Sequence, residues 1–309
     1  MKYVLIFFLS ISIRTFSQDT AVIIDEHKFT LAEVVVRNNF DYRTLLHQIK
    51  EDTTFYKAFR NLRVLGFSSY NDIKMLDKKG AVKASLFSKT RQNRQEGCRT
   101  MDVLEESVTG DLYNRKKEFN YMTPELYAGL FFTNGKICGE NNIVKGKNVL
   151  TSNKSGMAKH KEQLKMLFFN PCKKIPGIPF IGDKLDLYDE SAHKLYEYKL
   201  DIQEFHGSLS YVFSIIPKEE SAKSDRIVVD QMITWFDMKT LEVQARNYSL
   251  SYKAGVYDFD VSMEVEMTKF EGLTVPKILR YNGNWDVIFK KRERALFTAT
   301  LFDFVKEGH

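Results

Sequence analysis

The clearest pattern in the chain is an alternation of apolar and polar residues between positions 257 and 268. A period of two with one polar side predicts a strand of an antiparallel sheet that buries one face and leaves the other in water. The runs at 226–236 and 241–252 predict neighbouring strands joined by a turn, and Asn282-Gly283 is a hairpin signal. The carboxyl-terminal half is therefore predicted to be a meander of long strands. The apolar positions of the alternating strand are Tyr257, Phe259, Val261, Met263, Val265 and Met267.

The first half of the chain predicts both helices and strands. Asp41 is a suitable N-cap for an amphipathic helix, whose apolar stripe begins at Leu45 and continues beyond residues 52–54 to Leu62. A second helix is expected at 123–132, where Thr123 caps the helix and Pro124 follows in the first turn. The remaining predictions are strands at 63–75, 81–90 and 98–108, a long polar loop at 134–159, a short basic helix at 159–169, and a hairpin of 194–204 with 208–217.

Together these elements predict an α+β fold built on one large, curved antiparallel sheet. We expect a half-barrel of about ten strands, with helices packed on its concave face. Three parts are expected along the chain, namely a signal peptide at 1–17, an extended segment at 18–40, and a single domain at 41–309. The aromatic share of 13% fits this fold, because one face of such a sheet must be buried.

The amino end has the order of a secretory signal. A positive start at Lys2 precedes an apolar run from Val4 to Ile13, and small residues at Thr15 and Ser17 precede Gln18. A run of about ten residues is too short to span a bilayer. No cysteine stands at the cleavage site, so a lipid anchor is not indicated. We therefore expect an exported protein, periplasmic or associated with the outer membrane, that is not transmembrane after cleavage. A buried amino-terminal strand is the alternative.

Export changes the interpretation of the three cysteines, because an oxidising compartment allows one disulfide and one unpaired thiol. Cys98 and Cys138 both stand beside glycine in turn-like contexts, and we predict that they pair. Cys172 is then the unpaired thiol. Three free, buried cysteines remain the alternative, since spacing does not fix connectivity.

The charge and the motifs of the chain exclude several classes of function. Loss of Lys2 and Arg14 with the signal lowers the formal net charge from +6 to +4, which is too weak a balance to indicate nucleic acid as a partner. The 6 histidines lack metal-ligand spacing, so no metal is expected. Neither a G-x-S-x-G motif nor a glycine-rich phosphate loop is present, and no cofactor is predicted.

Two charged groups have a structural and a functional interpretation. Asp258, Asp260, Glu264 and Glu266 form a row on one side of the alternating strand, spaced by roughly 6 to 7 Å as a glycosidase pair can be. The solvated face of an amphipathic strand explains the row more simply. The basic cluster at 290–294 is suited to anionic headgroups, but also to the defence of a strand edge.

The order of elements resembles a known family. A signal peptide, one early helix, several strands, mid-chain helices and a long meander over about 41–304 resemble the periplasmic lipoprotein-carrier (LolA/LolB-like) half-barrels. Trp235-Phe236-Asp237 at a strand end, followed by 240–252, carries part of the likeness. The stretch 30–36 is similar to segments of exported Bacteroidetes-type envelope proteins. The resemblance implies a concave apolar face that receives acyl chains.

On this basis we expect a non-catalytic envelope protein that binds a lipid or another apolar ligand in a groove of the sheet. Two alternatives stay open. One is an interaction module with a fully covered core and an outer-membrane or envelope protein partner, and the less favoured one is a hydrolase. The core interpretation also stays open for each ligand-contact candidate. These candidates are Trp235, Phe259, Val261, Met263, Val265, Trp285 and Phe289.

Overall fold

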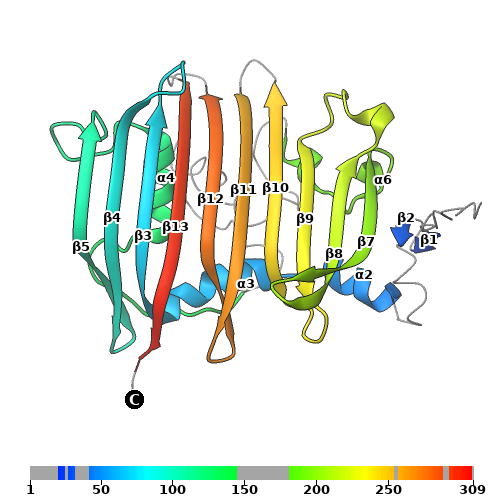
Figure 1. Cartoon of the computed structure of the whole chain (residues 1–309), viewed down its shortest axis with the longest axis horizontal. Coiled ribbons are helices and arrows are strands. Elements are labelled where there is room, and N and C mark those ends of the chain that lie inside the picture. The colour runs from blue at the N-terminus through cyan, green and yellow to red at the C-terminus, as the bar shows by residue number, and fades with distance from the viewer. Residues whose placement is uncertain are drawn as a thin grey trace, which may run out of the picture.

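The computed structural model describes residues 20–24, 27–31, 42–144, 181–253, 257–287 and 292–307. They form one sheet of 13 strands in the order β1-β2-β7-β8-β9-β10-β11-β12-β13-β3-β4-β5-β6 (Figure 1). The strands are β1 (Thr20–Ile24), β2 (His27–Leu31), β3 (Leu65–Leu76), β4 (Val82–Gln95), β5 (Cys98–Gly110), β6 (Ile137–Cys138), β7 (Tyr196–Phe205), β8 (Ser208–Pro217), β9 (Val229–Asp237), β10 (Val243–Lys253), β11 (Tyr257–Phe270), β12 (Leu273–Val287) and β13 (Glu293–Lys306).

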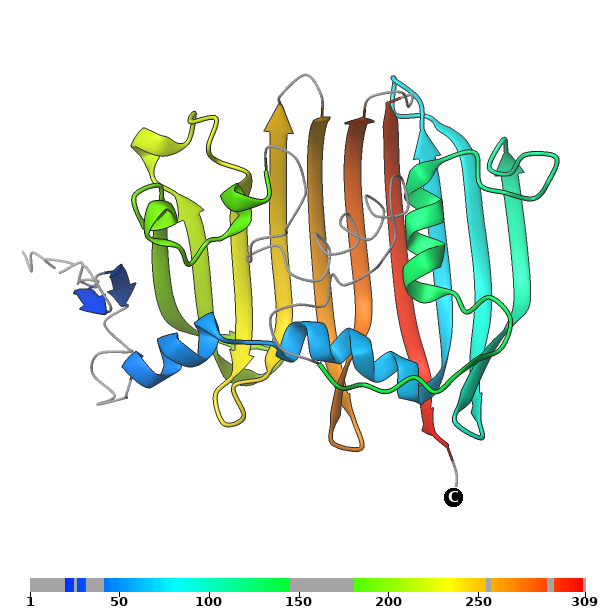
Figure 2. The same ribbon diagram turned by 180° about the vertical axis from the view of Figure 1, so that it is seen from behind.

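The four helices of the described residues lie on the same face of the sheet, as the view from behind shows (Figure 2). They are α2 (Tyr42–Lys50), α3 (Thr54–Asn61), α4 (Met122–Phe131) and α6 (Glu190–His193), with short 3-10 turns at Leu62–Val64, Asp183–Leu185 and Glu219–Ser221. The fold is an open α+β half-barrel with helices on its concave face. The predicted fold class is therefore confirmed.

The sheet is antiparallel from β7 to β6, and its order follows the chain in two runs. β13 joins the runs by pairing with β3, so the last strand lies beside the first long one, with Phe297 opposite Ile73. Most predicted strands and turns are confirmed within a few residues, among them the turn at 77–80. The His206-Gly207 turn is also confirmed, and both of its residues have positive φ angles of 50° and 78°.

The early helix differs from the prediction, because the structure breaks it into α2 and α3. The side chain of Asp52 causes the break by accepting hydrogen bonds from Thr54, at 2.8 Å from its backbone nitrogen and 2.6 Å from its hydroxyl. Such side-chain bonds to the backbone compete with helix continuation and favour a new helix start. Both helices bury the predicted apolar stripe from Leu45 through Phe59, and Leu62, just beyond α3, is buried as well.

Helix α4 confirms the second predicted helix, but the expected cap is wrong. Thr123 lies inside the helix, and the cap position Tyr121 offers no side-chain bond. The carboxylate of Glu293 on β13 accepts instead from the backbone nitrogens of Met122, at 2.7 Å, and Thr123, at 2.9 Å. This distant carboxylate satisfies helix donors that lack an internal partner and complements the helix dipole.

The hairpin expected at Asn282-Gly283 is also wrong, because β12 runs without interruption from Leu273 to Val287. Gly283 pairs with Val261 on one side and with Ala295 on the other, in the middle of the sheet. It serves close packing here, since a Cβ atom at this position would overlap the ring of Tyr281.

Several predictions lie outside the described residues. They are the signal peptide, Cys172, Phe289, the helix at 159–169 and most of the loop at 134–159. Among the helices that the structure describes, none is long and apolar enough to cross a membrane.

Candidate functional site

The candidate site is the middle of the concave face, where the inward residues of β11 lie. Phe259, Val261, Met263 and Val265 have exposed fractions of 4%, 3%, 2% and 0%. Their partners on β10 in register are Tyr252, Leu250, Tyr248 and Arg246, which share the same face. Four of the predicted contact residues therefore lie side by side on one buried surface, which we call the floor.

An aromatic row crosses the floor from β10 to helix α4. The ring of Phe259 lies 6.1 Å from that of Tyr252 and 5.3 Å from that of Trp285, measured between centroids. Farther along, Tyr281 stacks on Phe297 at 4.5 Å with an interplanar angle of 8°, and Phe297 lies 4.8 Å from Tyr127 of α4. The row is a continuous layer of buried apolar rings with few rotatable bonds.

Tyr281, Gly283 and Trp285 follow one another on the inward side of β12, two residues apart. The indole N–H of Trp285 donates to the phenol oxygen of Tyr281 across the space that the missing side chain of Gly283 leaves. Burial raises the pKa of Tyr281, and also that of Tyr127, well above the ordinary value of a phenol. Both phenols are therefore neutral at physiological pH, and the bond between Trp285 and Tyr281 satisfies the indole donor.

The helices that the structure describes cover the margins of the floor. Asn61 of α3 donates to the backbone oxygen of Thr274 at 2.8 Å, which fixes this helix over the Leu273 end of β12. Trp285 stands 11 residues farther along the strand, or about 36 Å away at the usual rise. Helix α4 lies over β13 and β3 at one flank, as Figure 2 shows. The aromatic row begins at this flank. It runs toward the end of β12 that carries Trp285, away from α3.

One charged pair borders the floor. The Arg246 guanidinium lies 3.5 Å from the Asp52 carboxylate, and each side chain is 7% exposed. Arg246 also donates to the Thr234 hydroxyl at 3.0 Å and lies over the ring of Phe55, at 4.4 Å from its centroid. The pair ties the junction of α2 and α3 to β10, so Arg246 is not an open positive charge for a ligand.

The structure separates Trp235 from the floor. Its neighbours Thr234 and Phe236 are buried inward, whereas Trp235 lies on the opposite, outer face, with its ring 5.6 Å from that of Phe205. The β7–β8 hairpin tip crosses this face (Figure 1), and His206 reaches Glu266 of β11 at 3.6 Å. Trp235 therefore packs beneath the hairpin tip. Of the seven predicted contacts, five share one face and Phe289 lies outside the described residues.

The carboxylate row lies on the outer face and forms ion pairs. Arg280 contacts Glu264 at 3.4 Å and Glu266 at 3.0 Å, and Arg292 contacts Asp258 at 3.5 Å. Such cross-strand pairs are typical of a solvated sheet face. Within the described part of the chain, no group of three or more histidine, cysteine or acidic residues is placed to hold a metal ion.

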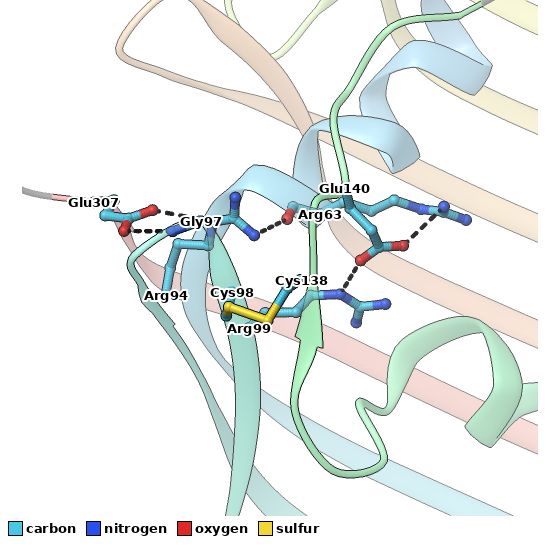
Figure 3. Close-up of a disulfide and its surroundings, with 8 residues drawn as sticks. All are labelled: Arg63, Arg94, Gly97, Cys98, Arg99, Cys138, Glu140 and Glu307. Carbon is cyan, nitrogen blue, oxygen red and sulfur yellow. Dashed lines mark hydrogen bonds and ion pairs between the residues drawn. A yellow bond between two sulfur atoms is a disulfide. The ribbon is translucent and has the colours of Figure 1, made fainter.

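A disulfide joins Cys98 of β5 to Cys138 of β6, the two cysteines predicted to pair (Figure 3). Beside it, Glu140 accepts from Arg99 at 2.5 Å and from Arg63 at 3.0 Å. Arg99 also donates to the hydroxyl of Thr133. The segment that follows α4 is thus fastened to β5 and to the 3-10 turn after α3.

Sequence reasoning missed Tyr248, Tyr281 and Phe297, which belong to the floor or the row. The signal for Tyr281 was present, because Tyr281, Gly283 and Trp285 keep the period of two. The interpretation of Asn282-Gly283 as a turn hid that period. Phe297 is the third inward residue of β13, where Glu293, Ala295, Phe297 and Ala299 alternate with more exposed positions.

No family model and no curated protein matches the chain. Comparison with known proteins finds similarity only to solved structures. The chain is similar to a DUF1329 family protein from Desulfovibrio piger ATCC 29098, at 12% identity over 82% of this chain and 91% of that one, with a TM-score of 0.26. It is also similar to a putative outer membrane lipoprotein-sorting protein domain from Vibrio parahaemolyticus. That match has 9% identity, covers 82% of this chain and 93% of the other, and has a TM-score of 0.27.

Proposed function

We propose that the protein binds a lipid or another apolar molecule on the floor, without catalysis, in the cell envelope. The observation that carries the proposal is the aromatic row from Tyr252 through Phe259 and Trp285 to Phe297. An acyl chain that enters this layer gains free energy in proportion to its own apolar area that leaves water, at about 25 cal/mol per Å².

The polar groups of the floor support an apolar ligand rather than a polar one. The indole donor of Trp285 is used by Tyr281, and the Tyr248 hydroxyl donates to the Met263 sulfur at 2.8 Å. Arg246 is held by Asp52 and Thr234. Binding sites for polar ligands place unsatisfied polar groups toward the ligand, and the bonds of these groups are directed within the protein instead.

The absence of catalysis is part of the proposal, and the position of the β11 carboxylates supports it. Asp258, Glu264 and Glu266 of β11 lie on the outer face and pair with arginines, so they do not converge on a ligand at the floor. A hydrolase needs titratable groups that converge in a cleft.

Native mass spectrometry of protein purified from its own envelope tests the proposal. We expect a mass above that of the bare polypeptide, and a further population when phospholipid is added. The variant Phe259→Leu should lower the bound fraction, whereas Trp235→Leu, a matched change on the outer face, should not. A bare polypeptide mass alone, without any shift on addition of phospholipid, would contradict lipid binding.

One observation favours the alternative of an envelope protein partner. Among the described strands, β5 pairs with β4 along its length, but on its other side only Cys98 and Arg99 pair with β6. Val103 and Leu104 on this edge are 58% and 54% exposed. Open edges of this kind accept an added strand from another chain. Val103→Pro should abolish such a complex and leave lipid binding intact.

A further inference from the structure

Three cations follow one another along helix α3 and the 3-10 turn after it. Lys57, Arg60 and Arg63 are spaced three residues apart, and the helical turns continue from α3 into the 3-10 turn. Residues with this spacing are neighbours on a helix surface, about 5 to 6 Å apart between their Cβ atoms. Phe55 and Phe59 mark the buried side of α3, so the three cations, which we call the basic stripe, lie away from the core.

Each cation of the basic stripe donates to one of three consecutive residues in the segment after β6. The acceptors are the Glu140 carboxylate for Arg63 at 3.0 Å, the Asn141 backbone oxygen for Arg60 at 2.8 Å, and the Asn142 backbone oxygen for Lys57 at 2.6 Å. The segment thus follows the stripe residue by residue. Only one of the three acceptors carries a negative charge.

The positive charge of the stripe is therefore not compensated. Glu140 also accepts from Arg99 of β5, so this one carboxylate serves two guanidinium groups, those of Arg63 and Arg99 (Figure 3). Within the described part of the chain, no carboxylate forms an ion pair with Lys57 or Arg60. Four cations share one carboxylate, and this balance favours an anion.

The cations are close enough to act on one another. Burial lowers the pKa of Arg63, and the positive charges of Arg60 and Arg99 lower it further. Arg94 donates to the backbone oxygen of Arg63 at 3.3 Å, but it does not add to the excess, because Glu307 pairs with it at 3.3 Å. An anion bound at the stripe would relieve the repulsion among its cations.

Arg60 also has a donor that the protein does not satisfy. One nitrogen of its guanidinium donates to Asn141, whereas its Nε–H is buried and has no acceptor among the described residues. A buried donor without a protein acceptor costs free energy unless another group, such as an ion, accepts from it. Arg60 is only partly buried as a residue, so an anion can approach its guanidinium from solvent.

We propose that the basic stripe is a binding site for a phosphate group, with Arg60 at its centre. Guanidinium groups hold phosphate oxygens through paired hydrogen bonds, and a doubly charged phosphate offsets the excess positive charge better than chloride does. The phosphate can be a free ion or part of a lipid headgroup, because the same side chains bind both. The site lies on the side of α3 away from the floor and does not depend on the proposed function.

Isothermal titration calorimetry of the full chain with inorganic phosphate tests this site, in a chloride buffer at constant ionic strength. We expect saturable binding of one phosphate per chain. Arg60→Gln should weaken binding about tenfold, because it removes a hydrogen bond between charged groups. Arg115→Gln removes the same charge from an exposed loop and should bind like the wild type.

Glu140→Gln distinguishes a binding site from a purely structural contact. The change removes the negative charge that competes with phosphate for the guanidinium groups, so phosphate should bind about fivefold more tightly. A stripe that serves only to fasten residues 140–142 would give no such gain. Because the expected effect is an increase, this variant decides the question even if Arg60→Gln folds poorly.

A short-chain phosphatidic acid, used below its micelle concentration, separates the two sources of phosphate. Displacement of inorganic phosphate would assign the site to a lipid headgroup, and failure to displace it would assign the site to the free ion; both results uphold the site. The proposal would be overturned by the absence of saturable binding, by unchanged binding in Arg60→Gln, by an equal loss in Arg115→Gln, or by weaker or unchanged binding in Glu140→Gln.

Discussion

The ring of Tyr281 lies over Gly283, in the space where any larger residue would place its Cβ atom. This relationship lets the phenol oxygen of Tyr281 reach the indole nitrogen of Trp285, four residues farther along the strand. It also presents the other side of the Tyr281 ring to Phe297. A single glycine therefore determines how the aromatic row of the floor is assembled.

Gly283→Ala should displace Tyr281 and break the Trp285 hydrogen bond. Overpacking of this kind costs about 1 to 3 kcal/mol of the free energy of unfolding. Urea unfolding measures the loss, and near-ultraviolet circular dichroism follows the rearranged rings. Asn282→Ala is the control, because Asn282 is exposed on the other side of the same strand and should change stability little. Equal effects of the two variants would show that the overlap with Tyr281 is relieved without cost.

Arg246→Met should detach the junction of α2 and α3 from the sheet. The change leaves the Asp52 carboxylate buried without its partner, and loss of one member of a buried pair costs about 3 to 5 kcal/mol. Stability to urea should fall by this amount. The double variant with Asp52→Asn should lose less than the two single variants summed, since their side chains interact at 3.5 Å. Additive losses would contradict this coupling.

The disulfide should contribute substantially to stability, because Cys98 and Cys138 are 40 residues apart in sequence. A closed loop of that length removes unfolded-state entropy worth about 4 kcal/mol at 25 °C. Cys98→Ser with Cys138→Ser should therefore unfold at a lower urea concentration than the oxidised wild type. Addition of a reductant should lower the wild-type midpoint to the same value, and no effect of reductant would contradict the bond.

Glu140 should make stability depend on pH on the acid side. Burial alone raises the pKa of its carboxyl, but hydrogen bonding to Arg99 and the charge of Arg63 outweigh burial and lower the pKa below the ordinary 4.5. A lowered pKa in the folded state contributes stability that is present above the unfolded value and is lost as the pH falls through the folded value.

Unfolding measured against pH tests this assignment. Wild type should exceed Glu140→Gln in stability near neutral pH, and the difference should shrink as the pH drops below about 4.5. Glu220→Gln replaces an exposed carboxylate and serves as the control, with a profile parallel to that of wild type. A constant difference between wild type and Glu140→Gln at all pH values would show that the charge of Glu140 is not the cause.

The sequence predicted elements well wherever one face of a strand is polar throughout. The inward positions Phe259, Val261, Met263 and Val265 all proved to be buried, because their outward neighbours are charged or hydroxylic and leave one orientation. Trp235 could not be placed, since β9 carries apolar residues on both sides and the β7–β8 hairpin tip covers its outer face. Contacts between distant segments decided that position.

The same limit explains the two wrong local predictions. Asn282-Gly283 has turn chemistry, but its role is set by the ring of Tyr281 and by pairing with β11 and β13 on both sides. Thr123 has N-cap chemistry, but Glu293, 170 residues away, accepts the helix donors. Arg246 and Asp52 are 194 residues apart, and no local pattern predicts their pairing.

The central claim is that an apolar ligand binds on the floor, and the two tryptophans allow a direct measurement. Trp285 lies on the floor and Trp235 lies on the outer face, so Trp235→Phe leaves one reporter at the site, and Trp285→Phe leaves one reporter away from it. A fatty acid brominated along its chain and added as monomer quenches an indole at contact. We predict saturable quenching of Trp285 in Trp235→Phe, with little quenching of Trp235 in Trp285→Phe. No quenching of Trp285, or equal quenching of both, would contradict the claim.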